Sequence, residues 1–242
     1  MLEVSHQAFN YWVYRTPEIR RYTTFYIPKK KGKSRKIDAP TNNIKILQQK
    51  LNQVLQAVYR SKPSAHGFVE GKSVRSNAAV HIKKTWVLNL DLEDFFPSIN
   101  FGRVRGMFMA KPYNVPERVA TVLAHLCCYN RYLPQGAPTS PVVSNMICAR
   151  MDSELQRLAA RNRCTYTRYA DDITFSTTQR RFPRNLAYYD GLKQIQPGHE
   201  LLKVIADNGF SVNHDKVWLR GRSSRQTVTG VTVNEFPNLP KK

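Results

Sequence analysis

Two short clusters of acidic residues carry the chemistry that this sequence could perform. Asp91, Glu93 and Asp94 lie close together, and Asp171 and Asp172 are adjacent. Neighbouring carboxylates repel one another unless a cation compensates their charge. An isolated Asp pair can simply shape a surface turn, but two clusters that face each other can bind hard divalent cations such as Mg²⁺. Two such ions, roughly 4 Å apart, support phosphoryl transfer by activating a hydroxyl and stabilising a leaving pyrophosphate.

Each cluster falls where a predicted strand ends. Residues 86–92 alternate, so that one tryptophan and three leucines share one face while Asp91 lies on the other. Residues 165–176 have the pattern of a hairpin with Asp171 and Asp172 at its turn, where Gly or Asn would be less costly. These positions favour the metal-binding interpretation over the surface turn.

The rest of the chain predicts a mixture of helices and hairpins. Apolar residues at helical spacing indicate the helices. Because helices and strands do not alternate as regular βαβ units, we predict an α+β fold. The expected elements are helices over residues 44–60, 117–129, 142–160 and 200–208 (the last ended by Gly209), a short helix capped by Ser76 and Asn77 and ending at His81, and strands over 210–219 and 227–233, the second interrupted by Gly230.

The chain is strongly basic. It has 38 Lys and Arg against 17 Asp and Glu, a net charge of +21, which indicates a polyanionic partner. The densest run, KKKGKSRK over residues 29–36, predicts a hairpin whose basic tip around Gly32 binds phosphate. No apolar run could span a bilayer, and the N-terminus lacks a secretory signal, so we expect a cytoplasmic protein that does not bind membranes.

The four cysteines also fit a cytoplasmic protein. Cys127, Cys128, Cys148 and Cys164 form no CxxC pair and have no His at zinc-finger spacing. We therefore expect reduced, mostly buried thiols. The 242 residues suffice for one large domain or two small ones.

The acidic motifs resemble those of reverse transcriptases. Tyr169-Ala170-Asp171-Asp172 resembles the YxDD box of that family, and LDLEDFFPSI around Asp91 resembles its first catalytic-acid motif. A YxDD tetrapeptide alone would be a weak signal. The further motifs below follow in the family's order and spacing, and together they cover about residues 22 to 235.

Three more segments extend the resemblance. Residues 134–141, PQGAPTSP, resemble the loop that opens the helix under the incoming nucleotide. Residues 25–40 resemble the fingertip hairpin, with Arg35 where the family grips the triphosphate. Gly209-Phe210 followed by Lys216 resembles the later palm motif, which supplies a lysine near the leaving group.

The resemblance implies a right-hand polymerase fold, with fingers plus a palm whose antiparallel sheet is backed by helices. Polymerases of this family carry a helical thumb after the palm. Because the sequence stops where that thumb should begin, we expect it to be absent or truncated. The expected domains are fingers at 1–86 and 102–140, palm at 87–101 and 141–237, and the start of the thumb at 238–242.

The resemblance also assigns roles in metal and nucleotide binding. Asp91, Asp171 and Asp172 would be the catalytic acids and would bind two Mg²⁺ ions, with the backbone carbonyl of Leu92 as a further ligand. Phe96 would exclude a ribose 2′-hydroxyl and so select dNTPs, whereas Phe95 is interpreted as an ordinary core aromatic. The residues expected to bind the nucleotide are Lys30, Arg35, Asp94, Phe96, Gln135, Gly136 and Lys216.

Two further signatures resemble retron reverse transcriptases in particular. Residues 77–81, NAAVH, resemble the NAxxH signature, and residues 228–230 the VTG signature. A helix cap with a core histidine and a strand with a bulge glycine are the plainer interpretations. The residues expected to bind RNA are Asn77, His81, Val228, Thr229, Gly230, Arg220, Arg222 and Arg225.

Retron enzymes, by this resemblance, copy a structured noncoding RNA into branched multicopy single-stranded DNA, often in anti-phage defence with an effector protein. The expected partners are therefore that RNA and its DNA product, dNTPs and an effector. Two alternatives stay open. One is a group II intron or diversity-generating reverse transcriptase, and the other is a non-catalytic palm-type RNA-binding module.

Overall fold

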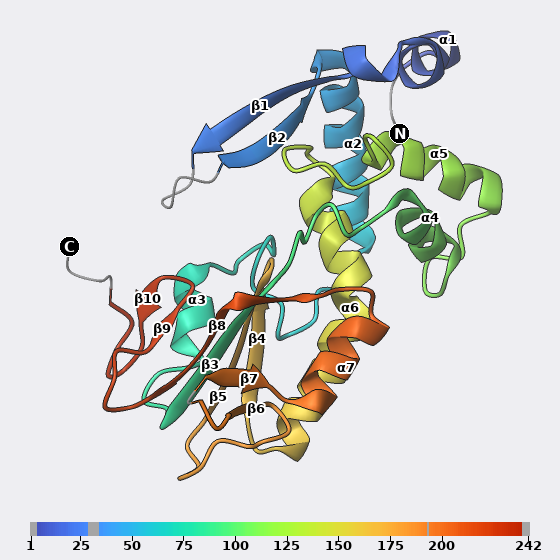
Figure 1. Cartoon of the computed structure of the whole chain (residues 1–242). Coiled ribbons are helices and arrows are strands. Elements are labelled where there is room, and N and C mark those ends of the chain that lie inside the picture. The colour runs from blue at the N-terminus through green and yellow to red at the C-terminus, as the bar shows by residue number, and fades with distance from the viewer. Residues whose placement is uncertain (1–3, 29–33, 193, 239–242) are drawn as a thin grey trace. The chain divides into compact units, whose positions relative to one another are not determined.

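The computed structural model describes residues 4–28, 34–192 and 194–238 (Figure 1). The chain forms two compact units, and each unit is built from two separate stretches of sequence. Unit 1 comprises Met1–Arg60 and Phe96–Ile147, and unit 2 comprises Ser61–Phe95 and Cys148–Lys242. The division differs from the predicted finger and palm boundaries chiefly in placing residues 61–86 in unit 2.

Unit 1 contains a two-stranded antiparallel sheet and most of the helices. The pairing of β1 and β2 runs from Tyr22 opposite Pro40 to Pro28 opposite Ser34, in agreement with the predicted hairpin. Its predicted tip at residues 29–33 lies outside the described residues. The elements are α1 (His6–Asn10), η1 (Tyr11–Arg15), η2 (Glu18–Arg20), β1 (Tyr22–Pro28), β2 (Ser34–Pro40), α2 (Asn42–Val58), α4 (Phe101–Met109), α5 (Glu117–Cys127) and the first part of α6 (Ser140–Arg161).

The long helix α2 agrees with the helix predicted over residues 44–60. Ile44, Leu47, Leu51 and Leu55 are all buried, at the spacing of one helical face. Gln48 is buried beside them, and its amide donates to the Leu126 carbonyl at 2.7 Å. The helix is therefore fixed by one apolar stripe and by a buried hydrogen bond to α5.

Unit 2 is built around a four-stranded antiparallel sheet with the strand order β4-β5-β3-β8. Two short hairpins, β6–β7 and β9–β10, accompany it. The elements are α3 (Val74–Ala79), β3 (Trp86–Leu92), β4 (Thr165–Tyr169), β5 (Asp172–Thr177), β6 (Ala187–Tyr189), β7 (Ile195–Pro197), α7 (His199–Asp207), β8 (Val212–Gly221), β9 (Thr227–Val228) and β10 (Val231–Thr232), with the rest of α6.

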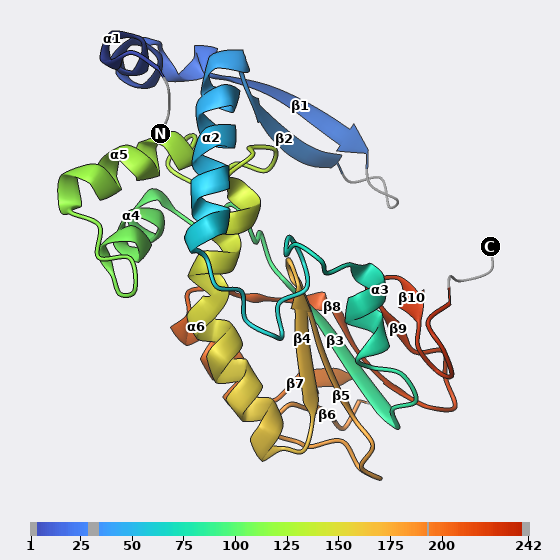
Figure 2. The ribbon, with the colours of Figure 1, turned by 180° about the vertical axis from the view of Figure 1, so that it is seen from behind.

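The predicted alternation along β3 divides the sheet into two faces. Leu88 is paired with Phe175, on the face where Tyr166 of β4 donates to Asp152 of α6. Val87 points the other way and packs with Ala78 of α3 and with valines of the β9–β10 segment. Figures 1 and 2 show α3 and the C-terminal half of α6 on opposite sides of this sheet. The α+β class and the antiparallel sheet backed by helices are thus confirmed.

Two local predictions need correction. The short helix α3 is capped by Ser73, whose side chain forms a capping box with Ser76, so the predicted cap at Ser76 and Asn77 was wrong. Residues 227–233 are not one interrupted strand but a tight hairpin. Its turn residues Thr229 and Gly230 both have positive φ, +48° and +80°, which reverses the chain at that point.

Candidate active site

The three aspartates predicted to be catalytic converge in unit 2. Asp91 is paired with Asp172 across the β3–β5 ladder, and Asp171 precedes Asp172 in the turn. Carboxylate oxygens of all three lie within 4.8 Å of one another. The strand register produces this arrangement, because directly opposed residues of an antiparallel pair point to the same face.

A strained two-residue turn holds Asp171. Tyr169 is paired with Asp172, so Ala170 and Asp171 connect β4 to β5. Ala170 has a φ of +56°, a conformation that favours glycine. The Leu92 amide donates to the Asp171 carbonyl at 3.0 Å, which ties the turn to the end of β3. Leu92 thus contacts the turn through its backbone amide, and the expected role of its carbonyl as a metal ligand stays a prediction.

The acids repel one another strongly. The pKa of Asp172 is raised to about 7, first by burial and then by the charges of Asp171 and Asp91. Lys216 opposes this effect, and its ammonium donates to both Asp91 carboxylate oxygens at 2.9 Å. Burial lowers the pKa of Lys216, but its hydrogen bond with Asp91 and the acidic charges raise it overall. This lysine therefore stays protonated at neutral pH.

The donor set fits hard divalent cations. Three carboxylates close together offer the oxygen ligands that Mg²⁺ prefers, and a cation would relieve the repulsion that raises the pKa of Asp172. A groove of about 450 Å³ opens beside the acids. It is lined by Asn89, Leu90, Asp91, Asp172, Asp215, Lys216, Trp218, Thr227, Thr229 and Gly230.

The segment after β3 separates into turn and core residues. Asp94 is exposed and has a φ of +41°, in keeping with a residue that shapes the turn. Phe95 is 4% exposed and stacks on Phe210 with 5.7 Å between ring centroids, as predicted for a core aromatic. Phe96 is half-buried and begins the second stretch of unit 1.

The other predicted nucleotide contacts belong to unit 1. Arg35 is exposed on β2. The Gln135 carbonyl accepts from the Asp38 amide at 2.9 Å, so the loop packs along the hairpin. Gly136 has a φ of +129°, and a Cβ there would lie 2.9 Å from Ile37 Cγ2, so glycine is required. Lys30 lies outside the described residues. The joining of these residues and the acids in one site stays a prediction.

The two retron-like signatures contact each other. Asn77 is fully buried, and its amide donates to the Thr229 hydroxyl at 2.7 Å. His81 is also fully buried, with ring nitrogens 2.7 Å from the hydroxyls of Ser176 and Thr167. Burial lowers the pKa of His81 to about 3, which keeps the ring neutral. Asn77 and His81 thus support the sheet and the groove wall from inside the protein.

The signature turn itself reaches the groove. Thr229 and Gly230 line it, whereas Val228 is buried in the core beneath. The arginines at the end of β8 and just after it are partly engaged within the protein. The Arg220 guanidinium lies 4.6 Å from the Trp218 ring centroid, and Arg222 forms a 3.0 Å ion pair with Glu235. Arg225 is exposed.

Sequence reasoning missed a charged pair beneath the YADD turn. Arg168 of β4 and Asp152 of α6 are both fully buried and bonded at 2.8 Å. A signal was present, because Asp152 falls on the apolar face of the predicted helix over 142–160. An acid among buried residues needs a partner, but the sequence does not say which one.

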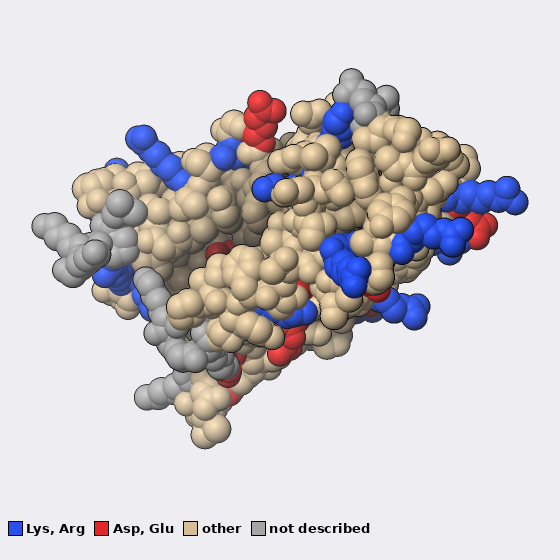
Figure 3. Space-filling view, turned by 90° about the horizontal axis from the view of Figure 1, so that it is seen from above, with Lys and Arg blue, Asp and Glu red and all other residues tan. Residues whose placement is uncertain are grey.

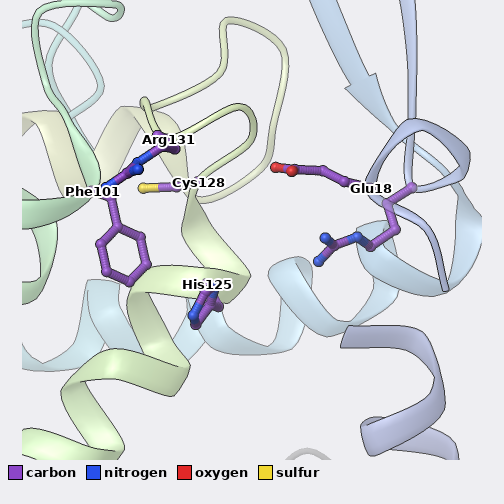
Figure 4. Close-up of a pocket in the computed structure, with 6 residues that line it drawn as sticks. Glu18, Phe101, His125, Cys128 and Arg131 are labelled. Atoms are coloured by element: carbon purple, nitrogen blue, oxygen red, sulfur yellow. The ribbon is translucent and has the colours of Figure 1, made fainter. Parts of the chain in front are cut away.

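A second cavity, of about 290 Å³, lies within unit 1. Figure 4 shows Glu18 pointing into it opposite Phe101, Cys128 and Arg131, with His125 below them. Since only one of its lining residues is acidic, it does not offer the clustered carboxylates of the site in unit 2.

Lys and Arg side chains are scattered over the face shown in Figure 3, in keeping with the high net charge.

Comparison with known proteins identifies the family. A family model described as reverse transcriptase (RNA-dependent DNA polymerase) matches residues 27–233. The chain therefore belongs to the reverse transcriptase family, and its curated relatives place it with the retron type. It is 38% identical to the retron Mx65 reverse transcriptase of Myxococcus xanthus, over 96% of this chain and 56% of that protein. It is 34% identical to the retron Ec86 reverse transcriptase of Escherichia coli, over 89% of this chain and 64% of that one.

Solved structures agree on the fold. Telomerase from Candida tropicalis, truncated from its C-terminal domain, aligns with a TM-score of 0.57 at 13% identity, over 93% of this chain and 56% of that one. Telomerase from Candida albicans, in complex with a fragment of telomeric RNA, aligns with a TM-score of 0.59 over 88% and 45%. The chain spans 47% to 70% of the length of the curated relatives it matches.

Two further predictions can be compared with the structure. All four cysteines are free and buried, as expected. Among the described helices, none is both long and apolar enough to cross a membrane.

Proposed function

We propose that this chain supplies the catalytic core of a retron RNA-directed DNA polymerase. The convergence of Asp91, Asp171 and Asp172 at one end of the unit 2 sheet is the observation that carries the proposal. The reaction is template-directed transfer of a nucleotidyl group. An RNA 2′-hydroxyl or a DNA 3′-hydroxyl loses its proton and bonds to the α-phosphorus of a dNTP, as the bond to pyrophosphate breaks.

The three acids would hold the metal ions, with the Leu92 carbonyl as a further ligand. When bound, two Mg²⁺ ions supply positive charge that lowers the pKa of the attacking hydroxyl and offsets charge on the pyrophosphate. Lys216 would exchange its contact with Asp91 for one with the leaving pyrophosphate once Asp91 binds the metal. Its raised pKa keeps the proton that such a contact requires.

The remaining predicted residues would bind substrates. Arg35 and Lys30 would contact the triphosphate, with Asp94 shaping the adjoining turn. Gln135 and Gly136 would approach the template and nucleotide through their backbone, and Phe96 would exclude ribonucleotides. The arginines at the end of β8 and just after it would contact the phosphate backbone of the RNA.

The biological setting is a further part of the proposal. We propose that the template is a structured noncoding RNA, that the product is branched single-stranded DNA, and that the system acts against phage together with an effector protein. The likeness to retron reverse transcriptases supports this setting. Sequencing the nucleic acid that copurifies from the host tests it, since a covalent RNA–DNA hybrid is expected.

A substitution at Asp171 tests the chemistry. The full gene product, incubated with its noncoding RNA, dNTPs and Mg²⁺, is expected to make DNA. Removing a preorganised electrostatic group typically lowers kcat by about 100- to 1,000-fold, so Asp171→Asn should lose at least roughly 100-fold. Asp207→Asn, at an exposed ion pair with Lys203, is the matched control and should keep full activity. Synthesis by Asp171→Asn at the control rate would show that the site is misassigned.

A further inference from the structure

The catalytic turn rests on a buried charge network that the reaction itself does not use. Arg168 and Asp152 side chains are 0% exposed. The pair is bidentate, with Arg168 Nε and Nη2 each donating to a different Asp152 oxygen at 2.8 Å. Tyr166 donates a third hydrogen bond to Asp152 at 2.7 Å. The guanidinium is therefore held in one plane and one orientation.

The third guanidinium nitrogen of Arg168 contacts the catalytic turn. Arg168 Nη1 donates to the carbonyl of Ala170 at 2.9 Å. Ala170 is the residue with the φ of +56°, and a left-handed residue with a Cβ costs roughly 1–2 kcal/mol. Such strain persists only where the surroundings fix the backbone. Arg168 supplies one of those constraints.

The backbone of the neighbouring loop supplies others. The Arg168 backbone amide donates to the Ser64 carbonyl at 2.9 Å, and the Arg168 carbonyl accepts from the His66 backbone amide at 2.8 Å. A Cβ on Gly67 would lie only 2.5 Å from the Ala170 nitrogen, so the loop packs directly against the turn. The Lys72 ammonium donates to the Pro63 and Ala65 carbonyls at 2.6 and 2.7 Å, which fixes the loop in turn.

Stability alone does not account for this pair. Replacing a buried ion pair by apolar residues of similar size is often neutral or stabilising. The cost of desolvating a buried guanidinium is offset where its planar group donates several hydrogen bonds in fixed directions. Here the third donor points at the peptide that carries the metal-binding acids.

We propose that Arg168 is a positioning residue. Clamped by Asp152, its guanidinium fixes the Ala170 carbonyl and thereby the spacing of Asp171 and Asp172 from Asp91. This inference rests on the proposed function, in which those acids bind divalent cations. It assigns Asp152 and Tyr166 the task of orienting Arg168.

The test measures Mn²⁺ binding directly, by electron paramagnetic resonance of the full gene product without nucleotides. Arg168→Lys keeps the buried positive charge, but one ammonium cannot maintain the bidentate pair and the Ala170 contact together. We expect Mn²⁺ affinity to fall at least tenfold, with kcat lowered and the KM for dNTP little changed. Arg150→Lys, at the exposed pair with Glu154 on α6, is the matched control and should behave as wild type.

A second variant separates positioning from folding. Arg168→Met combined with Asp152→Leu and Tyr166→Phe removes both charges and the buried hydroxyl that donates to Asp152, so the melting temperature should stay near that of wild type while Mn²⁺ affinity falls as in Arg168→Lys. Wild-type Mn²⁺ affinity and kcat in either folded variant would overturn the proposal. If wild type binds Mn²⁺ but makes no DNA, the proposed function fails, and the Mn²⁺ comparison still decides the role of Arg168.

Discussion

At the scale of single residues, the site is defined by charges brought closer together than they would remain in water. Asp172 shows the consequence most clearly, since its burial, and after that the charges of Asp171 and Asp91, raise its pKa to about 7. Lys216 compensates Asp91 but does not remove the effect on Asp172. The site thus stores electrostatic repulsion that a bound cation would release.

The raised pKa of Asp172 predicts a pH-dependent stability. Between about pH 4 and 7, folded Asp172 keeps a proton that the unfolded chain has released. Unfolding then releases protons, and this contribution to stability falls as pH rises. Asp172→Asn cannot ionise, so in EDTA its melting temperature should exceed that of wild type by several degrees at pH 8 and by much less at pH 5. Each kcal/mol corresponds to about 2–4 °C in a chain of this size.

Thermal unfolding at the two pH values measures the difference. The buried histidines titrate alike in both proteins, so their contributions cancel. Added Mg²⁺ should raise the melting temperature of wild type more than that of Asp172→Asn. An advantage of the variant that is equal at pH 5 and pH 8 would contradict the raised pKa.

At the scale of elements, hairpins and their turns position most of the predicted site. The β4–β5 turn carries Asp171, the β9–β10 turn lines the groove, and the loop before α6 packs against β2. These turns use backbone conformations that ordinary residues avoid. Substitutions of these turn residues should therefore lower the unfolding free energy more than surface substitutions do.

Gly136→Ala tests the loop before α6. The added methyl would meet Ile37 Cγ2 and the Asp38 carbonyl at 2.9 and 3.0 Å, at a φ of +129°. We expect a loss of about 1–3 kcal/mol in unfolding free energy, measured by denaturant titration. Gly106→Ala is the control, because it lies inside α4 with nothing within 4 Å of the added atom. That change should be neutral or stabilising by up to about 1 kcal/mol, and an equal effect of both would refute the steric argument.

Much of the unit 2 sheet could be predicted because its signals are local. Alternation over residues 86–92 gave β3 at its observed bounds, and the YADD hairpin was predicted from the strand residues on both sides of the two acids. Pairings between distant segments left no such signal. Nothing in the sequence joins Asn77 to Thr229 or Arg168 to Asp152, because each pairing exists only after the sheet forms. The β9–β10 hairpin was missed because Thr229 adopts a left-handed conformation unusual for a β-branched residue.

At the scale of the whole molecule, the net charge of +21 dominates any interaction with RNA. When binding releases counterions, the logarithm of the association constant falls linearly with the logarithm of the salt concentration. The slope has a magnitude of about 0.7–0.9 for each phosphate contact. We expect a steep salt dependence for the noncoding RNA. Arg225→Ala should reduce the slope by roughly 0.7–0.9, since Arg225 is exposed.

Fluorescence anisotropy at several salt concentrations measures these slopes. Lys203→Ala, on α7 and paired with Asp207, removes one positive charge without removing a predicted RNA contact. Its slope should equal that of wild type. A slope for Arg225→Ala that matches Lys203→Ala would remove Arg225 from the RNA-binding set.

The order of strands in unit 2 has a consequence for synthesis on the ribosome. Strand β3 emerges early, yet both of its neighbours, β5 and β8, come from residues 172–177 and 212–221. Until then its two edges and its leucines lack their partners, and unpaired edges of this kind promote aggregation. The nascent chain must shield this segment through the translation of all of α4, α5 and α6, so slow elongation there should lower the yield of folded protein.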